Sequence, residues 1–217
     1  ETKEVIARSH IKFKLFDVKN NDYVCQTITY PNKQTICEWE TDDNGEFVTA
    51  YPLHSGTYRL EEVDQKVDGY LWNKVSHEFT IGENADLRTD SEYGIIFDTN
   101  FENTPVKGEV KINKVGEIAK LTDNGYVFTK ESLEGIVFGL YQNNKEITTG
   151  VTNKEGILTF SNLKLGSYCI KELKTLDGYI LNDKAICFEL KYKDQYTPVI
   201  NYETLVENKL QTSKLEI

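Results

Sequence analysis

The sequence predicts an all-β protein made of two tandem β-sandwiches. Its composition favours strands, because 13 Tyr and 10 Phe occur against no Met and two Trp, and aromatic residues are enriched in sheets. Short apolar segments alternate with turns rich in Gly, Asn and Asp, which is typical of a sandwich. One motif also occurs twice, 110 positions apart, in a chain of 217 residues. That length suffices for two small domains.

The repeated motif is a Gly turn, a short strand that carries Tyr, an acid at the end of that strand, and a closing Asp-Gly-Tyr turn. Alternation along the strand places the Tyr, the next apolar residue and the acid on one face. An isolated carboxylate in an apolar core is costly, so each acid needs a partner or a proton. The first copy comprises Gly56, Tyr58, Leu60, Glu62 and Asp68-Gly69-Tyr70, and the second comprises Gly166, Tyr168, Ile170, Glu172 and Asp177-Gly178-Tyr179.

The boundary between the domains is expected at residues 104–108, which contain Pro105, one of only four prolines, between two expected strands. The domains are then residues 1–104 and 105–217. In the first we expect strands at 11–16, 23–30, 34–39, 46–51, 56–62, 77–81 and 93–101. In the second we expect strands at 110–114, 136–141, 166–172, 185–192 and 199–206, with a loop over 116–134 that carries a short helix near 130–133.

The C-terminal residues repeat the start of the second domain. Asn208 is followed nine residues later by Ile217, and Asn103 is followed nine residues later by Ile112. The sequence therefore predicts that the chain ends inside the first strand of a following repeat, as part of a longer array. The missing initiator Met agrees with an excised fragment.

The four cysteines flank two turns in symmetric pairs. Cys25 and Cys37 lie on either side of a Pro-Asn turn, and Cys169 and Cys187 lie on either side of the second Asp-Gly-Tyr turn. If each turn closes an antiparallel pair of strands, the cysteines face one another, as in the cross-strand disulfides of an exported protein. The alternative is four buried thiols that act as small apolar residues.

Charge and motif content disfavour several classes of function. A net charge of −10, with acids spread along the chain, disfavours nucleic acid and anionic membranes as partners. We find no apolar run long enough to span a bilayer and no signal peptide. His10, His54 and His77 lack metal-ligand spacing, and Asp42–Gly45 resembles only part of a calcium loop. The sequence therefore predicts neither a metal, nor a cofactor, nor an enzyme.

Each domain offers a lysine and an asparagine as partners for its acid. The apolar residues two and four positions before Lys114 share its strand face, so Lys114 is expected to point inward with them. Asn208 follows the last strand of the same domain, and first and last strands commonly lie side by side in a sandwich. The corresponding residues of the first domain are Lys12 and Asn103. A Lys, a Glu and an Asn are therefore expected to meet in each core.

These motifs resemble the Cna B-type (SpaA-like, prealbumin-like) domains of Gram-positive surface proteins and pili. The lysine strand, the Tyr-x3-Glu strand with Asp-Gly-Tyr, and the terminal asparagine occur in this order twice, and the resemblance covers nearly the whole chain. It implies two Ig-like, transthyretin-like sandwiches. In that family the Lys and Asn join in a spontaneous intramolecular isopeptide bond, which the Glu catalyses. The resemblance thus implies Glu62 and Glu172 as catalytic residues, and Lys12 with Asn103 and Lys114 with Asn208 as the cross-linked pairs.

The implied chemistry suits these residue types. A lysine desolvated in an apolar core loses its proton and becomes a nucleophile. A protonated Glu is expected to donate to the carboxamide oxygen of the Asn and to move protons as ammonia leaves. Each molecule reacts once with itself, so the protein is not an enzyme. By analogy with a disulfide, the bond is expected to stabilise each domain by about 4–5 kcal/mol.

Some assignments stay open in the sequence. Lys14 shares the strand face of Lys12, Asp98 is an alternative to Asn103 that would release water, and Lys111 competes with Lys114. The remaining alternative is that the Lys, Glu and Asn form an unreacted ion pair and hydrogen bond, or lie on the surface.

The function expected from the resemblance is a structural stalk or shaft module of an extracellular, cell-wall-anchored adhesin or pilus. The expected partners are neighbouring repeats of the same polypeptide, with either sortase-linked pilin subunits or a host surface ligand. The alternative function is a module that binds a host protein or glycan, with Trp39, Trp72 and exposed tyrosines as a sugar platform. The sequence does not distinguish a polymerising pilin from a monomeric stalk.

Overall fold

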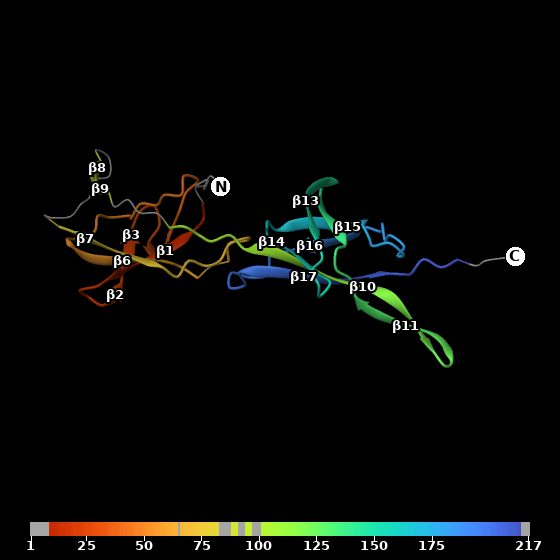
Figure 1. Cartoon of the computed structure of the whole chain (residues 1–217). Helices are drawn as coiled ribbons and strands as arrows, with labels where there is room; N and C mark the ends of the chain where they lie inside the picture. The colour runs from red at the N-terminus through yellow and green to blue at the C-terminus, as the bar shows by residue number, and fades with distance from the viewer. Residues whose placement is uncertain (1–8, 65, 83–87, 91–93, 97–100, 214–217) are drawn as a thin grey trace. The chain divides into compact units, whose positions relative to one another are not determined.

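The computed structural model describes residues 9–64, 66–82, 88–90, 94–96 and 101–213. Within these residues the protein is all-β and contains no helix, which confirms the predicted fold class. The chain divides into two compact units, Glu1–Thr104 (unit 1) and Pro105–Ile217 (unit 2) (Figure 1). The described part of the chain includes no helix with the length and apolar character needed to cross a membrane.

Unit 2 is a sandwich of two sheets. In one sheet, the first half of β10 pairs with β14 and β17, and its second half pairs with β11. The other sheet has the order β13-β12-β15-β16. The strands are β10 (Lys107–Thr122), β11 (Gly125–Ser132), β12 (Val137–Gln142), β13 (Lys145–Val151), β14 (Ile157–Leu163), β15 (Gly166–Lys174), β16 (Ile186–Leu190) and β17 (Val199–Asn208).

The first and last strands of unit 2 lie side by side, as the sequence predicted. β10 and β17 run parallel and pair from Lys107 opposite Val199 to Gly116 opposite Asn208. Between the sheets lies an apolar core to which β10, β12, β15, β16 and β17 contribute; its members include Val110, Ile112, Phe138, Leu140, Tyr168, Ile170, Leu190 and Val206. The acid strand thus faces the lysine strand across this core.

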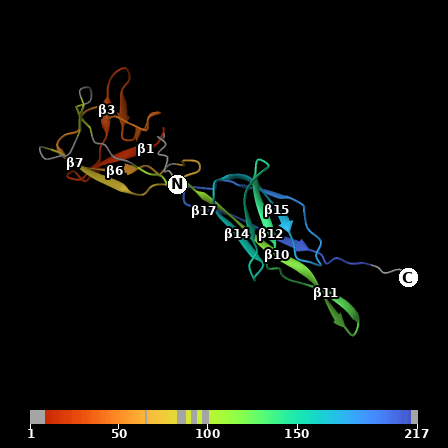
Figure 2. The ribbon, with the colours of Figure 1, turned by 45° about the horizontal axis from the view of Figure 1, so that its top comes forward.

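The last part of β10 and all but the final residue of β11 form a hairpin arm, residues 117–131, that projects from the rest of unit 2 (Figures 1 and 2). This corrects the prediction of a loop with a short helix over 116–134. Asp123 and Asn124 form the turn, and Gly125, the first residue of β11, has a φ of +104° that glycine adopts without strain. Large apolar side chains on the arm are exposed, namely Leu121, Tyr126, Val127 and Phe128.

Unit 1 contains one larger sheet and two short hairpins. The larger sheet has the order β2-β1-β6-β7, with β5 also paired to β1, and the hairpins are β3-β4 and β8-β9. The strands are β1 (Lys12–Asp17), β2 (Asp22–Tyr23), β3 (Gln26–Ile28), β4 (Gln34–Ile36), β5 (Trp39–Glu40), β6 (Gly56–Glu62), β7 (Ser76–Ile81), β8 (Arg88–Asp90) and β9 (Gly94–Ile96).

β1 of unit 1 is the structural counterpart of β12 in unit 2, and not of β10. Phe13 lies opposite Glu62 on β6, and Phe138 likewise lies opposite Glu172 on β15. A threonine supports the start of each strand, because Thr41 Oγ1 accepts from the N–H of Ile11 at 3.0 Å, as Thr152 Oγ1 does from Ile136 at 3.0 Å.

Two other expected strands of unit 1 differ or lie outside the described residues. Residues 46–51 form no strand. Instead, the buried side chain of Gln26 pairs with the backbone of Tyr51, donating to its carbonyl at 2.7 Å and accepting from its N–H at 2.9 Å. Of the strand expected at 93–101, residues 94–96 form β9 and residue 101 is described. The expected start of a third repeat falls on residues 214–217, which also lie outside the described residues.

Candidate cross-linking sites

The site in unit 2 is built around Lys114, which is only 1% exposed. Alternation along β10 turns Lys114 toward the core with Val110 and Ile112, as predicted. Its backbone is held on both sides, since its N–H donates to Gly156 at 2.7 Å and its carbonyl accepts from Leu133 at 3.0 Å. Gly156 has a φ of +71°, and a Cβ there would collide with the Lys114 carbonyl. Only glycine therefore fits beside the lysine.

Glu172 and Asn208 meet the Lys114 amine inside the core, and they are 2% and 1% exposed. Nζ of Lys114 lies 2.5 Å from Asn208 Oδ1 and 3.1 Å from Glu172 Oε2. The other oxygen of the acid, Oε1, accepts from Asn208 Nδ2 at 2.7 Å. The carboxyl group thus bridges the lysine nitrogen and the amide nitrogen. The predicted contact of the acid with the amide oxygen is therefore replaced by a contact with the amide nitrogen.

Burial changes the acid–base behaviour of the lysine. Desolvation lowers the pKa of Lys114, and the hydrogen bond and charge of Glu172 oppose this effect. An ammonium group without water is costly. The site thus favours a neutral amine at Lys114.

Two residues that sequence reasoning missed support the acid and the amide. Thr175 Oγ1 accepts a hydrogen bond from Asn208 Nδ2 at 2.6 Å. Asn182 directs its backbone N–H toward Glu172 Oε1 at 3.5 Å, and its side chain donates to the carbonyl of Glu207 at 3.4 Å. The signal for Asn182 was present, because an Asn follows Asp-Gly-Tyr at the same spacing in both units.

The Asp-Gly-Tyr turn packs against the lysine strand beside the site. The hydroxyl of Tyr179 donates to the carbonyl of Glu117 at 3.0 Å. A side chain at Gly116 would collide with the Tyr179 ring and with Leu133. Lys111, the competing lysine, points away from the core and forms an ion pair with Glu203 at 3.1 Å on the surface. Lys111 is therefore not part of the site.

Unit 1 brings its acid and its asparagine together. Glu62 is 5% exposed, and its Oε1 lies 3.5 Å from Asn103 Nδ2. Desolvation raises the pKa of Glu62 to about 7, opposed by hydrogen bonds from Asn103 and from the backbone of Asn73. The side chain of Asn73 donates to the carbonyl of Glu102 at 3.3 Å. Asn73 thus repeats the role of its counterpart in unit 2.

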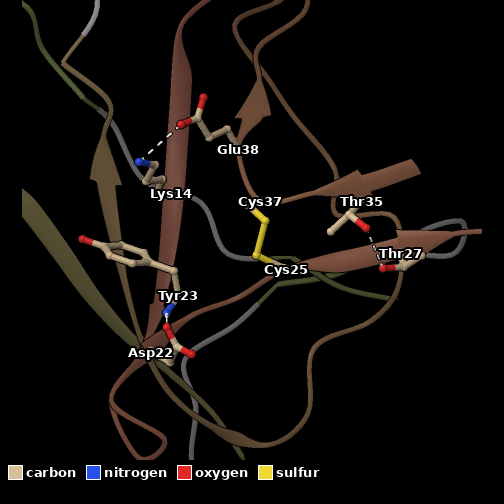
Figure 3. The surroundings of a disulfide bond; sticks show 8 residues. All are labelled: Lys14, Asp22, Tyr23, Cys25, Thr27, Thr35, Cys37 and Glu38. Atoms are coloured by element: carbon tan, nitrogen blue, oxygen red, sulfur yellow. Dashed lines mark hydrogen bonds and ion pairs between the residues drawn. A yellow bond between two sulfur atoms is a disulfide. The ribbon is translucent and has the colours of Figure 1, made fainter. Parts of the chain in front are cut away.

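Neither predicted lysine of unit 1 reaches this pair, which corrects the sequence prediction. Phe13 and Glu62 are direct partners in an antiparallel ladder, so their side chains share a face and those of Lys12 and Lys14 point to the other. Lys14 instead forms an ion pair with Glu38 at 3.3 Å (Figure 3). Asp98, the alternative acceptor, lies outside the described residues.

Two polar atoms at the candidate site of unit 1 are left without a hydrogen bond among the described residues. They are Glu62 Oε2 and Asn103 Oδ1, both buried, and Trp39 Nε1 elsewhere in unit 1 is a third such atom. In unit 2, Asn208 Oδ1 accepts a hydrogen bond from the Lys114 amine, and Glu172 Oε2 lies 3.1 Å from the same amine although it too has no hydrogen bond. Buried polar atoms are rarely left unpaired in folded proteins. Glu62 Oε2 and Asn103 Oδ1 are thus the counterparts of the two atoms that face the lysine amine in unit 2.

Each unit contains one disulfide. Cys25–Cys37 closes the end of the β3-β4 hairpin (Figure 3). Cys169–Cys187 joins directly opposed residues of β15 and β16. Cys25 and Cys187 are exposed, so the cysteines are not buried thiols of the core.

The remaining candidate residues form no recognisable site. Trp39 is 4% exposed in the core, and Trp72 is half-buried and donates to the Glu62 carbonyl at 3.3 Å. Asp42 accepts from the backbone of Asn44 and Glu46 within its own turn. In the described part of the chain, no cluster of His, Cys, Asp and Glu suits a metal ion.

Comparison with known proteins decides the family. The profile of the SpaA prealbumin-like fold domain matches residues 6–93 and 108–204, once in each unit. The chain belongs to this family. The match to this family confirms the resemblance that the motifs indicated. The all-β structure of both units agrees with it.

Two relatives show how this SpaA-domain chain compares with longer proteins. It is 34% identical over 104 residues to the trypsin-resistant surface T6 protein of Streptococcus pyogenes serotype M6, which covers 39% of this chain and 19% of that protein. It superposes on the TIE protein of Bacillus anthracis with a TM-score of 0.58 and 23% identity, over 97% of this chain and 32% of the other. The chain thus spans about a fifth and about a third of their lengths.

A third relative is the minor pilin of Streptococcus agalactiae. Its solved structure is 20% identical to this chain, with a TM-score of 0.40, over 99% of this chain and 89% of the pilin.

Proposed function

We propose that this chain is a load-bearing module of an extended structure on the surface of a Gram-positive cell, and that unit 2 cross-links itself through an isopeptide bond between Lys114 and Asn208. The observation that carries the proposal is the buried contact of an amine, a carboxyl group and a carboxamide. The family assignment and the surface and pilin names of the relatives agree with it.

The reaction starts from a neutral amine. Burial lowers the pKa of Lys114, and a proton passes from Nζ to Glu172 Oε2 at 3.1 Å. The free electron pair of Nζ then attacks Cγ of Asn208, whose Oδ1 lies 2.5 Å from Nζ. Proximity in the folded state removes most of the entropic cost of this step.

Glu172 completes the reaction as an acid. Its Oε1 side lies 2.7 Å from Nδ2, so it returns the proton to the leaving nitrogen. The Nζ–Cγ bond forms as Nζ passes a second proton to Glu172, the Cγ–Nδ2 bond breaks, and ammonia leaves. The products are a secondary amide, ammonia and a Glu172 carboxyl group that keeps the proton of the original ammonium group, and no redox partner is required.

The bond would join the first and last strands of unit 2. It closes a loop of 94 residues, and a disulfide of that span stabilises a protein by about 4–5 kcal/mol in the chain-entropy account. Because β10 and β17 are parallel, tension between the ends of the unit would load a covalent bond before the strand hydrogen bonds. This property suits a stalk or a pilus shaft.

For unit 1 we propose the same reaction with a lysine from outside the described residues. The two unpaired atoms, Glu62 Oε2 and Asn103 Oδ1, support this assignment. Lys3 is the one lysine among residues 1–8, and it is therefore the first candidate. Lys12 and Lys14 are not proposed as the reacting lysine, because they lie on the face of β1 that points away from Glu62.

The intact mass of the reduced chain tests both parts. For unit 2 we expect the mass of one ammonia to be missing, and we expect it to return in Glu172→Gln and Asn208→Ala. A wild-type chain of full mass would refute the cross-link. A second missing ammonia that returns in Lys3→Arg would assign unit 1 to that residue. If it returned in Lys12→Arg or Lys14→Arg, the assignment for unit 1 would be wrong.

A further inference from the structure

Thr175 lies where the nitrogen that leaves in the proposed reaction must be held. It directly follows β15, three residues after Glu172, and its hydroxyl accepts from Asn208 Nδ2 at 2.6 Å. Among the described residues, Asn208 is the hydrogen-bond partner of the Thr175 side chain. The hydroxyl therefore binds the amide of Asn208 and not a group of its own turn.

Each polar position of the Asn208 carboxamide has its own partner. Oδ1 faces the lysine amine at 2.5 Å. One N–H of Nδ2 goes to Glu172 at 2.7 Å, and the other goes to Thr175. Three contacts in three directions fix both the plane of the carboxamide and its rotation. Without Thr175, the amide nitrogen is held only by the acid that must also move a proton.

We propose that Thr175 is a positioning residue for the cross-link of unit 2 and the first acceptor for the ammonia that leaves. This inference rests on the proposed reaction between Lys114 and Asn208. In that reaction Nδ2 changes from a planar amide nitrogen to ammonia, and it keeps N–H groups to donate at every stage. The Thr175 hydroxyl can accept from each of these species without moving.

The exposure of Thr175 agrees with a role in product release. Lys114, Glu172 and Asn208 are at most 2% exposed, whereas Thr175 is half-buried at the edge of the site. Ammonia that leaves the core must pass to water, and a hydroxyl at the edge lowers the cost of that passage by keeping a hydrogen bond.

The test measures the rate of cross-linking after synthesis. The whole chain is made in a cell-free reaction, synthesis is stopped, and samples are quenched in acid at intervals. Intact mass gives the fraction that has lost ammonia, and protease resistance gives the folded fraction. The variants are Thr175→Val, which keeps the shape but removes the acceptor, Thr175→Ser, which restores the hydroxyl, and Thr149→Val on an exposed part of β13 as the control.

We expect Thr175→Val to fold at the wild-type rate but to lose ammonia roughly fivefold to tenfold more slowly, the cost of about one hydrogen bond. Thr175→Ser and Thr149→Val should react like the wild type. Thr175→Val that reacts at the wild-type rate would overturn the inference alone. Slowing that follows slower folding would show a structural role and would also overturn it. A wild type that never loses ammonia would remove the proposed reaction itself.

Discussion

Burial of Lys114 in a small core has a large cost in desolvation free energy. A lysine and a glutamate without water cost more in desolvation than their attraction returns, unless the geometry is very good. Here the pair shares its site with a carboxamide that reaches both partners. Conversion of the amine into an amide would remove both charges, because the ammonium group is lost and Glu172 keeps its proton. On this account the cost of burying Lys114 is temporary, and the product is a neutral core.

The pKa of Glu62 makes the stability of unit 1 depend on pH. The pKa is about 7 in the folded state against an ordinary value of 4.5, so between these values the folded state binds more protons than the unfolded state. The contribution of Glu62 to the free energy of unfolding is therefore fully present below about pH 4.5 and is lost as pH rises through about 7. The loss is up to about 3 kcal/mol at one pKa unit per 1.36 kcal/mol.

Urea unfolding between about pH 5 and about pH 8 checks this prediction. Both tryptophans, Trp39 and Trp72, lie in unit 1, so tryptophan fluorescence reports on this unit alone. In Glu62→Gln the decline with pH should become much smaller. A wild-type stability that rises over this range, or an equal decline in the variant, would contradict the assignment.

At the scale of single elements, the hairpin arm of β10 and β11 is separate from the chemistry of its own strand. The first half of β10 is buried and carries the lysine, whereas the second half ends in exposed residues. All eight residues of β11 are exposed. The same strand thus changes from core element to appendage just after Gly116, where the pairing with β17 ends.

Shortening the arm tests this division. Lys120–Val127 is replaced by Asn-Gly, which forms a tight turn between the paired residues Ala119 and Phe128. Because the deleted side chains are mostly exposed, we expect ammonia loss at the wild-type rate and a change in unfolding free energy of less than about 1 kcal/mol. Time-resolved intact mass and urea unfolding measure both. An uncross-linked variant would show instead that the arm helps to align β10 with β17.

The sequence predicted the site of unit 2 correctly but chose the wrong lysine strand in unit 1. For Lys114 it sufficed, because apolar residues at two and four positions before the lysine indicate its face, and Asn208 comes just after the strand expected at 199–206. In unit 1 the same alternation was read from Lys12, although the buried residues are Ile11, Phe13 and Leu15. The same Ile-x-Phe-x-Leu pattern occurs at Ile136, Phe138 and Leu140 of unit 2. Comparing the two segments would have matched this strand of unit 1 with β12 and not with β10.

Other features needed the folded structure. The pairing of the arm depends on the turn at residues 123–124, and the polar composition of the segment gave no pattern from which its strands could be predicted. Residues 46–51 alternate like a strand, yet the side chain of Gln26 takes the backbone groups of Tyr51 that a neighbouring strand would bind. Thr175 has no motif at all, because its role comes only from its distance to Asn208.

At the scale of the whole molecule, the proposed isopeptide bond between Lys114 and Asn208 would join the first and last strands of unit 2 outside the backbone. The two units have separate cores, so each would carry tension through its own first and last strands. Such a chain would resist extension in proportion to the number of units that have reacted.

The most direct measurement is a proteolytic digest of the reduced, denatured chain, read by tandem mass spectrometry. The account predicts one branched peptide in which Nζ of Lys114 is joined to Cγ of Asn208, with the loss of one ammonia, and its absence from Glu172→Gln. Separate, unmodified peptides that carry a free Lys114 and an intact Asn208 in the wild type would contradict it. The three residues would then form only a buried ion pair and hydrogen bond.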